Sequence, residues 1–241
     1  MRCRREEPGG GGKGVQLLKA VEGDPVVNGF FITFEGIEGS GKTTQTMRLA
    51  DHLITSGLDV VLTREPGGTM LGKEIRKLLL DPAIDPMPPI TELFLYFADR
   101  SEHVERLIKP SLEEGKVVVC DRFSDSTIAY QGYGRGLDLE EIITLDIIAR
   151  SGLEPNLTIL LDMDVSAGLE RNRRADKFDR FEAEELDFHR RVRDGYLEIA
   201  RKNPERIKVV DAGRGEQEVW EEIRAIVTDL ISMRQEGNGF N

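Results

Sequence analysis

The sequence predicts an α/β protein with a five-stranded parallel sheet that is covered by helices on both faces. Short runs of apolar residues alternate along the chain with longer segments of helical periodicity, which is the pattern of strands joined by crossover helices. The runs are continuously apolar, as in strands buried on both faces. The first run leads directly into a glycine-rich loop that opens a helix. The 241 residues allow a single domain with a sizeable core.

The strands are predicted where apolar runs end at turn residues or at charged residues. In chain order they are Phe30–Phe34, Asp59–Thr63, Lys116–Cys120, Leu157–Leu161 and Ile207–Asp211.

The helices are predicted where apolar residues recur at helical spacing. They are Thr43–Thr55, Gly72–Asp81, Ile90–Ile108, Asp138–Arg150, Glu182–Lys202 and Glu216–Met233. A further helix is predicted to start with the segment Val165–Arg171. The third continues toward Gly115 with a disturbance near Pro110, since proline interrupts the helical hydrogen bonds. Residues 82–89 contain four prolines and are predicted to form a loop.

The ends of the chain differ from this alternating part. Residues 1–28 combine a charge cluster with a glycine tract and are predicted to form a flexible extension. Residues 29–236 form the predicted domain, and 237–241 a short tail. No run of about 18 apolar residues occurs, so no membrane contact is predicted.

The charge balance and the cysteine count limit the binding partners and the cellular location that the sequence predicts. The chain has 33 Lys and Arg against 44 Asp and Glu, a net charge of −11. Such an acidic balance argues against nucleic acid as the main partner, because phosphate contacts along a duplex need a basic face. The two cysteines are too few for a disulfide framework, which favours a cytoplasmic location.

The glycine-rich loop reads "GIEGSGKT" at residues 36–43 and matches the phosphate-binding pattern G-x-x-x-x-G-K-[ST]. Glycines let successive amides turn toward one anion, and the helix N-terminus adds partial positive charge. The lysine is predicted to reach the outer phosphates of a nucleotide. The alternative is a strand–helix turn that happens to contain a lysine. The predicted nucleotide contacts are Gly36, Ile37, Glu38, Gly39, Ser40, Gly41, Lys42, Thr43 and Thr44.

A magnesium site is predicted beside this loop. The hydroxyl of Thr43 can offer an oxygen to Mg²⁺, and Asp121 directly follows a buried strand, where a metal carboxylate of such sites is expected. The alternative for Asp121 is a turn or a helix N-cap.

Four arginines near predicted strand ends favour a second phosphorylated ligand. Open parallel sheets bind ligands at the carboxyl ends of their strands, and several guanidinium groups there can clamp a phosphate. Each one taken alone is more often a solvated surface side chain. The chain has no N-K-x-D element, which disfavours a GTPase. The four are Arg64, Arg76, Arg100 and Arg122.

Four segments of the chain are similar to the signature segments of bacterial thymidylate kinases. They read "FITFEGIEGSGKTTQ", "TREPGGT", "DRFSDSTIAYQGYGRG" and "LDMDVSAGLERNRRADKFDRFE", and the resemblance covers Phe30–Met233. It implies a three-layer P-loop NTPase fold with a small basic lid at about 170–181. It also implies a homodimer and transfer of the γ-phosphoryl group of ATP to dTMP, which gives dTDP and ADP.

The resemblance also implies roles for substrate-binding residues. Glu38 would accept a hydrogen bond from the sugar 3′-OH, and Arg76 and Arg122 would hold the monophosphate. Tyr96 would stack on the thymine while Arg100, one helical turn away, meets the base edge. The neighbouring Phe94 and Phe97 compete for the stacking role, and all three aromatic residues could instead belong to the core.

Three further residues follow from the same resemblance. Thr127 and Gln131 would read the polar edge of the base, and Tyr130 would crowd the sugar 2′ position and disfavour a ribonucleotide. Taken without the resemblance, Thr127 and Gln131 fit helix capping or solvent contact equally well.

The lid is predicted to supply a catalytic arginine. Phosphoryl transfer spreads negative charge over oxygens that a guanidinium can neutralise, and the loop at 37–40 carries no arginine. The candidates are Arg171, Arg173 and Arg174, with Arg173 slightly favoured. The alternative is a solvated, charged helix end.

Two rival functions remain at this point. A deoxynucleoside kinase on the same scaffold would need Glu38 or Glu65 as a general base. A nucleotide-gated binding module without catalysis ranks last, because the chain retains Lys42, Thr43 and the lid arginines.

Overall fold

The computed structural model describes residues 29–84, 87–174, 181 and 184–237. Residues 1–28, the middle of the predicted lid and residues 238–241 lie outside the described part. All strand pairings are parallel, and the sheet order is β2-β3-β1-β4-β5. The predicted α/β fold is therefore confirmed. The strands are β1 Phe30–Glu35, β2 Val60–Arg64, β3 Val117–Asp121, β4 Leu157–Asp162 and β5 Ile207–Asp211.

The helices lie between these strands in the predicted order. They are α1 Lys42–Thr55, α2 Met70–Leu80, α3 Pro89–His103, α4 Lys109–Glu113, α5 Ser124–Thr127, α6 Leu139–Ala149, α7 Val165–Arg174, α8 Leu186–Lys202 and α9 Glu216–Gly237. Two π-helical turns, η1 Val104–Ile108 and η2 Ile128–Gly134, continue α3 and α5. In the described part of the chain, no helix is both long enough and apolar enough to span a bilayer.

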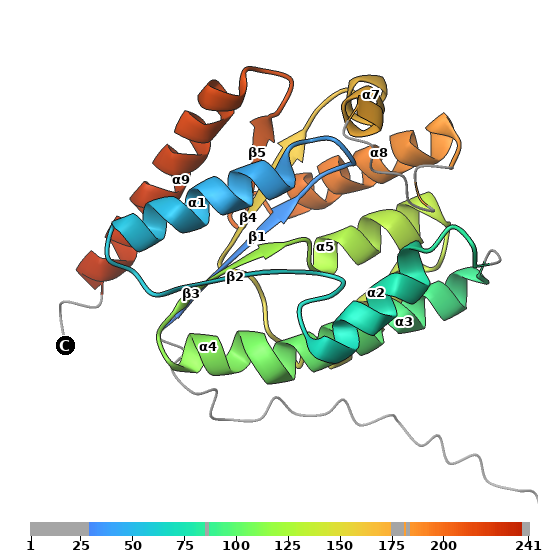
Figure 1. Ribbon diagram of the computed structural model, residues 1–241, viewed down its shortest axis with the longest axis horizontal. Coiled ribbons are helices and arrows are strands. Elements are labelled where there is room, and N and C mark those ends of the chain that lie inside the picture. The colour runs from blue at the N-terminus through green and yellow to red at the C-terminus, as the bar shows by residue number, and fades with distance from the viewer. Residues whose placement is uncertain (1–28, 85–86, 175–180, 182–183, 238–241) are drawn as a thin grey trace, which may run out of the picture.

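The sheet forms the middle of three layers (Figure 1). Successive residues of β1 point to opposite faces: Phe34 packs with Leu49 of α1, whereas Phe31 packs with Ile108 of η1. α9 lies beside α1, and the rings of Trp220 and His52 meet edge to face. The opposite layer contains α4, α5 and α8.

One of the helix predictions is confirmed, one is wrong, and one helical segment was missed. The predicted disturbance near Pro110 is present as the π-helical turn η1, which lies just before the proline. A wider turn there relieves the clash between the proline ring and the carbonyl four residues earlier. α8 begins at Leu186 instead of Glu182, because the backbone of Glu185 is extended. The segment 124–134 is helical, although the strand and helix pattern left it unassigned.

The strand register places the site. Phe34 of β1 and Arg64 of β2 both pair with Asp121 of β3, so these strands end at one level of the sheet. The loops that follow them therefore converge at one edge.

Candidate active site

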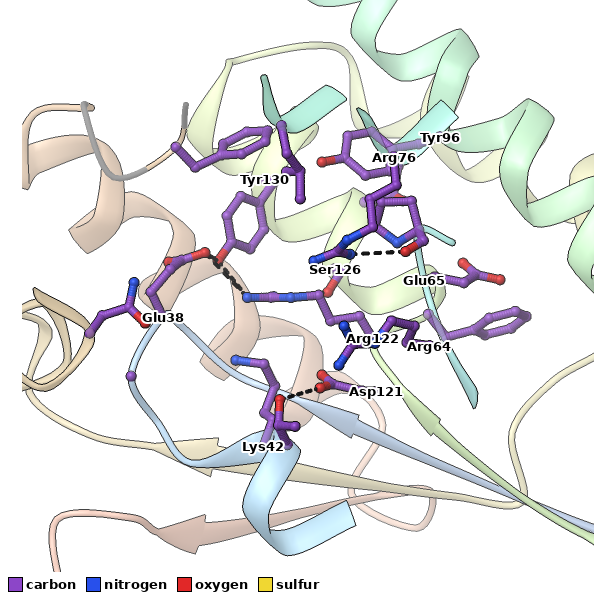
Figure 2. A pocket seen from close by; sticks show the side chains of 18 of the residues that line it. Glu38, Lys42, Arg64, Glu65, Arg76, Tyr96, Asp121, Arg122, Ser126 and Tyr130 are labelled. Atoms are coloured by element: carbon purple, nitrogen blue, oxygen red, sulfur yellow. Dashed lines mark hydrogen bonds and ion pairs between the residues drawn. The ribbon is translucent and has the colours of Figure 1, made fainter. Parts of the chain in front are cut away.

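A pocket of about 400 Å³ opens at this carboxyl edge. The loops after β1, β2 and β3 contribute to its lining, together with α2, α3, η2 and α7. Figure 2 shows Lys42 and Asp121 on one side of the pocket and Arg76 and Tyr96 on the opposite side, with Arg122 between them. The lining contains every predicted substrate-binding residue: Glu38, Arg76, Tyr96, Arg100, Arg122, Thr127, Tyr130 and Gln131.

The glycine-rich loop wraps around the ammonium group of Lys42. The Nζ atom donates to the carbonyl oxygens of Gly36 at 2.9 Å and Ile37 at 2.7 Å, and to Oγ of Ser40 at 3.3 Å. The three residues that accept these hydrogen bonds hold the lysine side chain against the loop. They are Gly36, Ile37 and Ser40, and none of them is part of the pocket lining. Gly39, Gly41, Lys42, Thr43 and Thr44 do line the pocket.

Gly41 leaves the N-terminus of α1 open to the pocket. Its φ of 91° is left-handed, and none of the described side chains caps the 14-residue helix. A Cβ at Gly41 would meet no atom within 4 Å. The amides of the first helical turn are therefore available to an anion, which fits the predicted phosphate contact.

Gly39 holds the loop against α7. Its φ is 72°, and a Cβ at this position would lie 1.9 Å from the carbonyl oxygen of Gly168. Conversely, a Cβ at Gly168 would lie 2.6 Å from the carbonyl oxygen of Glu38. The loop and the helix that leads into the predicted lid therefore meet backbone to backbone.

The ammonium group of Lys42 loses its proton at a lower pH than that of an ordinary lysine. Its side chain is buried, and burial together with the nearby charge of Arg122 lowers the pKa of Lys42 to about 8. An anion placed beside it would restore the preference for the ammonium form.

Thr43 and Asp121 meet at the edge of the loop, where Oγ1 of Thr43 donates to Oδ2 of Asp121 at 2.9 Å. A hydroxyl and a carboxylate side by side are suitable oxygen ligands for Mg²⁺. Among the described residues, no three His, Cys, Asp or Glu side chains form a metal cage. Two protein oxygens fit an ion that takes its other ligands from phosphate and water.

Arg122 sits at the centre of the pocket on strained backbone. Its φ of 72° is unusual for a residue with a side chain and costs on the order of 1–3 kcal/mol. Nη1 donates to the Gly36 carbonyl and to the hydroxyls of Ser126 and Tyr196. Nη2 donates to Glu38 at 3.2 Å and to the Tyr130 hydroxyl at 3.2 Å. These partners lock the guanidinium in place.

Glu38 is held as a carboxylate. Burial alone would raise its pKa, but the neighbouring His189 ring and the charges of Arg122 and Lys42 together keep the pKa well below its usual range. Oε1 accepts from Arg122 and from the Tyr130 hydroxyl. Oε2 lies 3.5 Å from Nδ1 of His189, and within the described residues it has no hydrogen-bond partner.

Arg76 and Arg64 line the other side of the pocket. Arg76 donates to the Pro66 carbonyl at 2.9 Å, and the peptide bond between Glu65 and Pro66 is cis. Burial and the like charge of Arg64 lower the pKa of Arg76. Uncompensated positive charge beside Arg122 suits a phosphate dianion.

Of the three aromatic candidates on α3, only Tyr96 lines the pocket. Phe97 is buried in the core, and Phe94 is 55% exposed and is not among the lining residues. Arg100, one turn from Tyr96, is fully buried. It pairs with Glu65 at 2.9 Å and with Asp146 at 2.7 Å.

The remaining predicted base contacts already have protein partners. Oγ1 of Thr127 accepts from Nη2 of Arg100 at 2.9 Å, and Nε2 of Gln131 donates to Glu92 at 3.0 Å. Both nevertheless line the pocket, so the helical spacing assumed for them brings them to the same site.

Of the candidate lid arginines, Arg171 lines the pocket and donates to the Ala212 carbonyl at 3.1 Å. Arg173 is exposed and is not in the lining, and Arg174 pairs with Glu170 on the surface. Residues 175–180 of the predicted lid lie outside the described residues.

Sequence reasoning missed the carboxylates that hold the arginines. Glu65 was considered only as a general base, yet it pairs with Arg100 and His103. Asp146 was not singled out, although an aspartate within the apolar stretch "IITLDIIA" is a detectable signal. Glu92 gave no such signal, because it stands in the first turn of a helix, where acids are common.

Comparison with known proteins identifies the family. The thymidylate kinase family model matches residues 34–223. The chain belongs to the thymidylate kinase family. The activity of this family is phosphorylation of dTMP to dTDP with ATP, and the predicted activity is thereby confirmed.

Individual relatives agree. Thymidylate kinases of Desulfovibrio desulfuricans and Pelobacter propionicus are 50% identical over 214 residues and 51% identical over 212 residues. Each alignment covers 86% of this chain, and 99% and 95% of the respective relative. A crystal structure of thymidylate kinase from Ehrlichia chaffeensis matches with 41% identity and a TM-score of 0.68, covering 83% of this chain and 98% of that one.

Proposed function

We propose that this thymidylate kinase binds ATP on the glycine-rich loop and dTMP among the side chains beyond Arg122. The first-turn amides of α1 and the ammonium group of Lys42 hold the donor phosphates. Thr43 and Asp121 would hold Mg²⁺, which would supply positive charge to neutralise the donor phosphates. The open N-terminus of α1 and the 2.9 Å contact between Thr43 and Asp121 support these roles.

On the acceptor side, Arg76 and Arg122 orient the dTMP monophosphate. Glu38 receives the sugar 3′-OH, and Tyr130 limits the space at the 2′ position. Tyr96 covers the face of the thymine, while Arg100, Thr127 and Gln131 meet its edge. The presence of all these side chains in one pocket supports this assignment.

The reaction needs positioning more than proton transfer. The attacking atom is a phosphate oxygen of dTMP, which is already ionised near neutral pH, so no strong general base is required. Arg122 lies between the donor and acceptor positions and bears a charge that compensates the transferring group. From α7, Arg171 is the better placed of the lid candidates to approach the same group, because it already lines the pocket.

The observation that carries the proposal is the position of Arg122 between Lys42 and Arg76. The test is a coupled ADP-release assay with a panel of nucleoside monophosphates and with thymidine. We expect dTMP to give the highest kcat/KM and thymidine no turnover. Turnover of thymidine but not of dTMP would favour the deoxynucleoside kinase.

We also propose a homodimer, formed through α3 and α6. These helices are neighbours, and each exposes apolar residues one turn apart: Ile90 and Phe94 on α3, Ile143 and Ile147 on α6. Exposed apolar side chains on two adjacent helices are typical of a protein–protein interface. Light scattering should report a dimer that Phe94→Asp converts to monomer; a monomeric wild type would contradict the proposal. A cytoplasmic location stays a prediction.

A further inference from the structure

One buried carboxylate near the pocket has no role in the reaction described above. Glu92 lies in the first turn of α3 and is 1% exposed. Its Oε1 accepts from Nε2 of Gln131 at 3.0 Å and from Nε of Arg135 at 3.2 Å. Arg135 in turn donates to Glu184 at 2.6 Å. Glu92 is therefore held in place by a cation on one side and presents an acceptor to Gln131 on the other.

This contact determines which way the Gln131 amide faces. An amide group carries a donor nitrogen and an acceptor oxygen, and it can turn over to exchange them. A carboxylate paired with an arginine only accepts, so the nitrogen must face Glu92. The oxygen is left for a ligand, because no described group donates to it. A buried Gln131 with its amide reversed would set two oxygens against each other.

Thr127 is oriented in the complementary sense. Its Oγ1 accepts from Arg100 at 2.9 Å, which leaves the hydroxyl hydrogen free to be donated. Toward the pocket, the two residues thus present one fixed acceptor and one donor. A thymine edge offers the matching N3–H donor and O4 acceptor. A cytosine edge offers the reverse, an acceptor at N3 and a donor at N4.

We propose that Glu92 is a positioning residue that fixes the Gln131 amide and so makes the pocket reject cytosine nucleotides. This inference rests on the proposed function, since it assigns the base to the side of the pocket that Thr127 and Gln131 line. Glu92 does not itself touch the base; it acts by fixing the hydrogen-bond polarity that Gln131 presents to the pocket.

The test compares dTMP with 5-methyl-dCMP, which differ only in the polar groups at positions 3 and 4 of the base. The readout is the ratio of their kcat/KM values. Glu92→Gln keeps the shape but can accept or donate, so the Gln131 amide is free to turn. We expect the ratio to fall at least about tenfold. Gln131→Met should lower it similarly, and the double variant should show no additional loss.

Glu184→Gln is the matched control. It removes the other carboxylate partner of Arg135 but leaves the contact between Glu92 and Gln131 intact. Its ratio should stay within about twofold of wild type. If Glu92→Gln does not fold, Glu92→Asp, which withdraws the same carboxylate by one methylene, takes its place with the same expectation.

Three outcomes overturn the inference: an unchanged ratio in the Glu92 variant, an unchanged ratio in Gln131→Met, or an equal fall in Glu184→Gln. Failure of the proposed base position looks different, because the ratio would then be unchanged in Gln131→Met. Failure of the inference alone would leave the fall in Gln131→Met and remove only the fall in the Glu92 variant.

Discussion

The two sides of the pocket are built by opposite means. Apart from Asp121, the donor side is one continuous stretch, residues 36–43, whose contacts are mostly backbone and whose lysine reaches back only five or six residues. The acceptor side is assembled from distant side chains. Arg100 pairs with Asp146, 46 residues away, and Arg122 donates to Tyr196, 74 residues away. A substitution in the glycine-rich loop should therefore affect the donor side alone. A substitution on the acceptor side should disturb several substrate-binding side chains at once.

The sharpest test of this contrast is Lys42→Ala. We expect kcat to fall by roughly 10³-fold, because the donor phosphates lose their ammonium partner. The Kd for dTMP, measured by calorimetry, should change less than about threefold, since the hydrogen bonds of Lys42 go to the glycine-rich loop and not to the side chains that hold dTMP. Arg48→Ala, on the same helix but outside the pocket lining, serves as the control. Near-normal turnover would remove the loop from the chemistry.

Arg122→Ala should change the kinetics of dTMP itself, because Arg122 contacts both the glycine-rich loop and the acceptor side of the pocket. We expect kcat/KM for dTMP to fall by roughly 10²-fold, with KM raised and kcat lowered, as monophosphate positioning is lost. Arg122→Lys should recover part of the loss, because it keeps the charge but cannot reach all five acceptors. An effect confined to the KM for ATP would contradict the assignment.

The donor side should also show a pH limit. The pKa of Lys42 is lowered to about 8, so rising pH removes its proton well before that of an ordinary lysine. We expect kcat/KM for ATP to fall above about pH 8, approaching tenfold per pH unit. The pH–rate profile measures this directly, and a flat profile up to pH 9.5 would show that the charge of Lys42 is not needed.

The smallest expected effect concerns the loop after β2. Asp99 accepts from the Gly67 amide at 2.9 Å, and burial with the nearby Glu65 raises its pKa from 3.8 to about 6. The folded state therefore binds the proton more tightly than the unfolded state, and stability falls as pH rises from about 4 to 6.

Asp99→Asn removes this titration while its amide oxygen can still accept from Gly67. Relative to wild type, the variant should gain roughly 1 to 3 kcal/mol of unfolding free energy between pH 4 and pH 7, measured by urea denaturation. Asp51→Asn, at an exposed position on α1, is the control. A difference that does not change with pH would contradict the raised pKa.

The same contrast explains what could be predicted from the sequence. The five strands and the glycine-rich loop are local patterns, and the structure places them within a residue or so of the prediction. The resemblance led to Arg76, Tyr96 and Gln131, all of which line the pocket. The sequence could not show that Glu92 or Asp146 lies beside them, because such pairings depend on how helices pack. The start of α8 was misplaced for a similar reason, since helical periodicity does not mark where a helix begins.

The backbone contact between Gly39 and Gly168 gives two positions that are distant in the sequence the same intolerance to a side chain. Gly168 has no part in the pocket lining, but it is one of the buried residues of α7. Even a methyl group there would push on the carbonyl of Glu38 from outside. A saturation mutagenesis survey should therefore find Gly168 as intolerant as the phosphate loop itself.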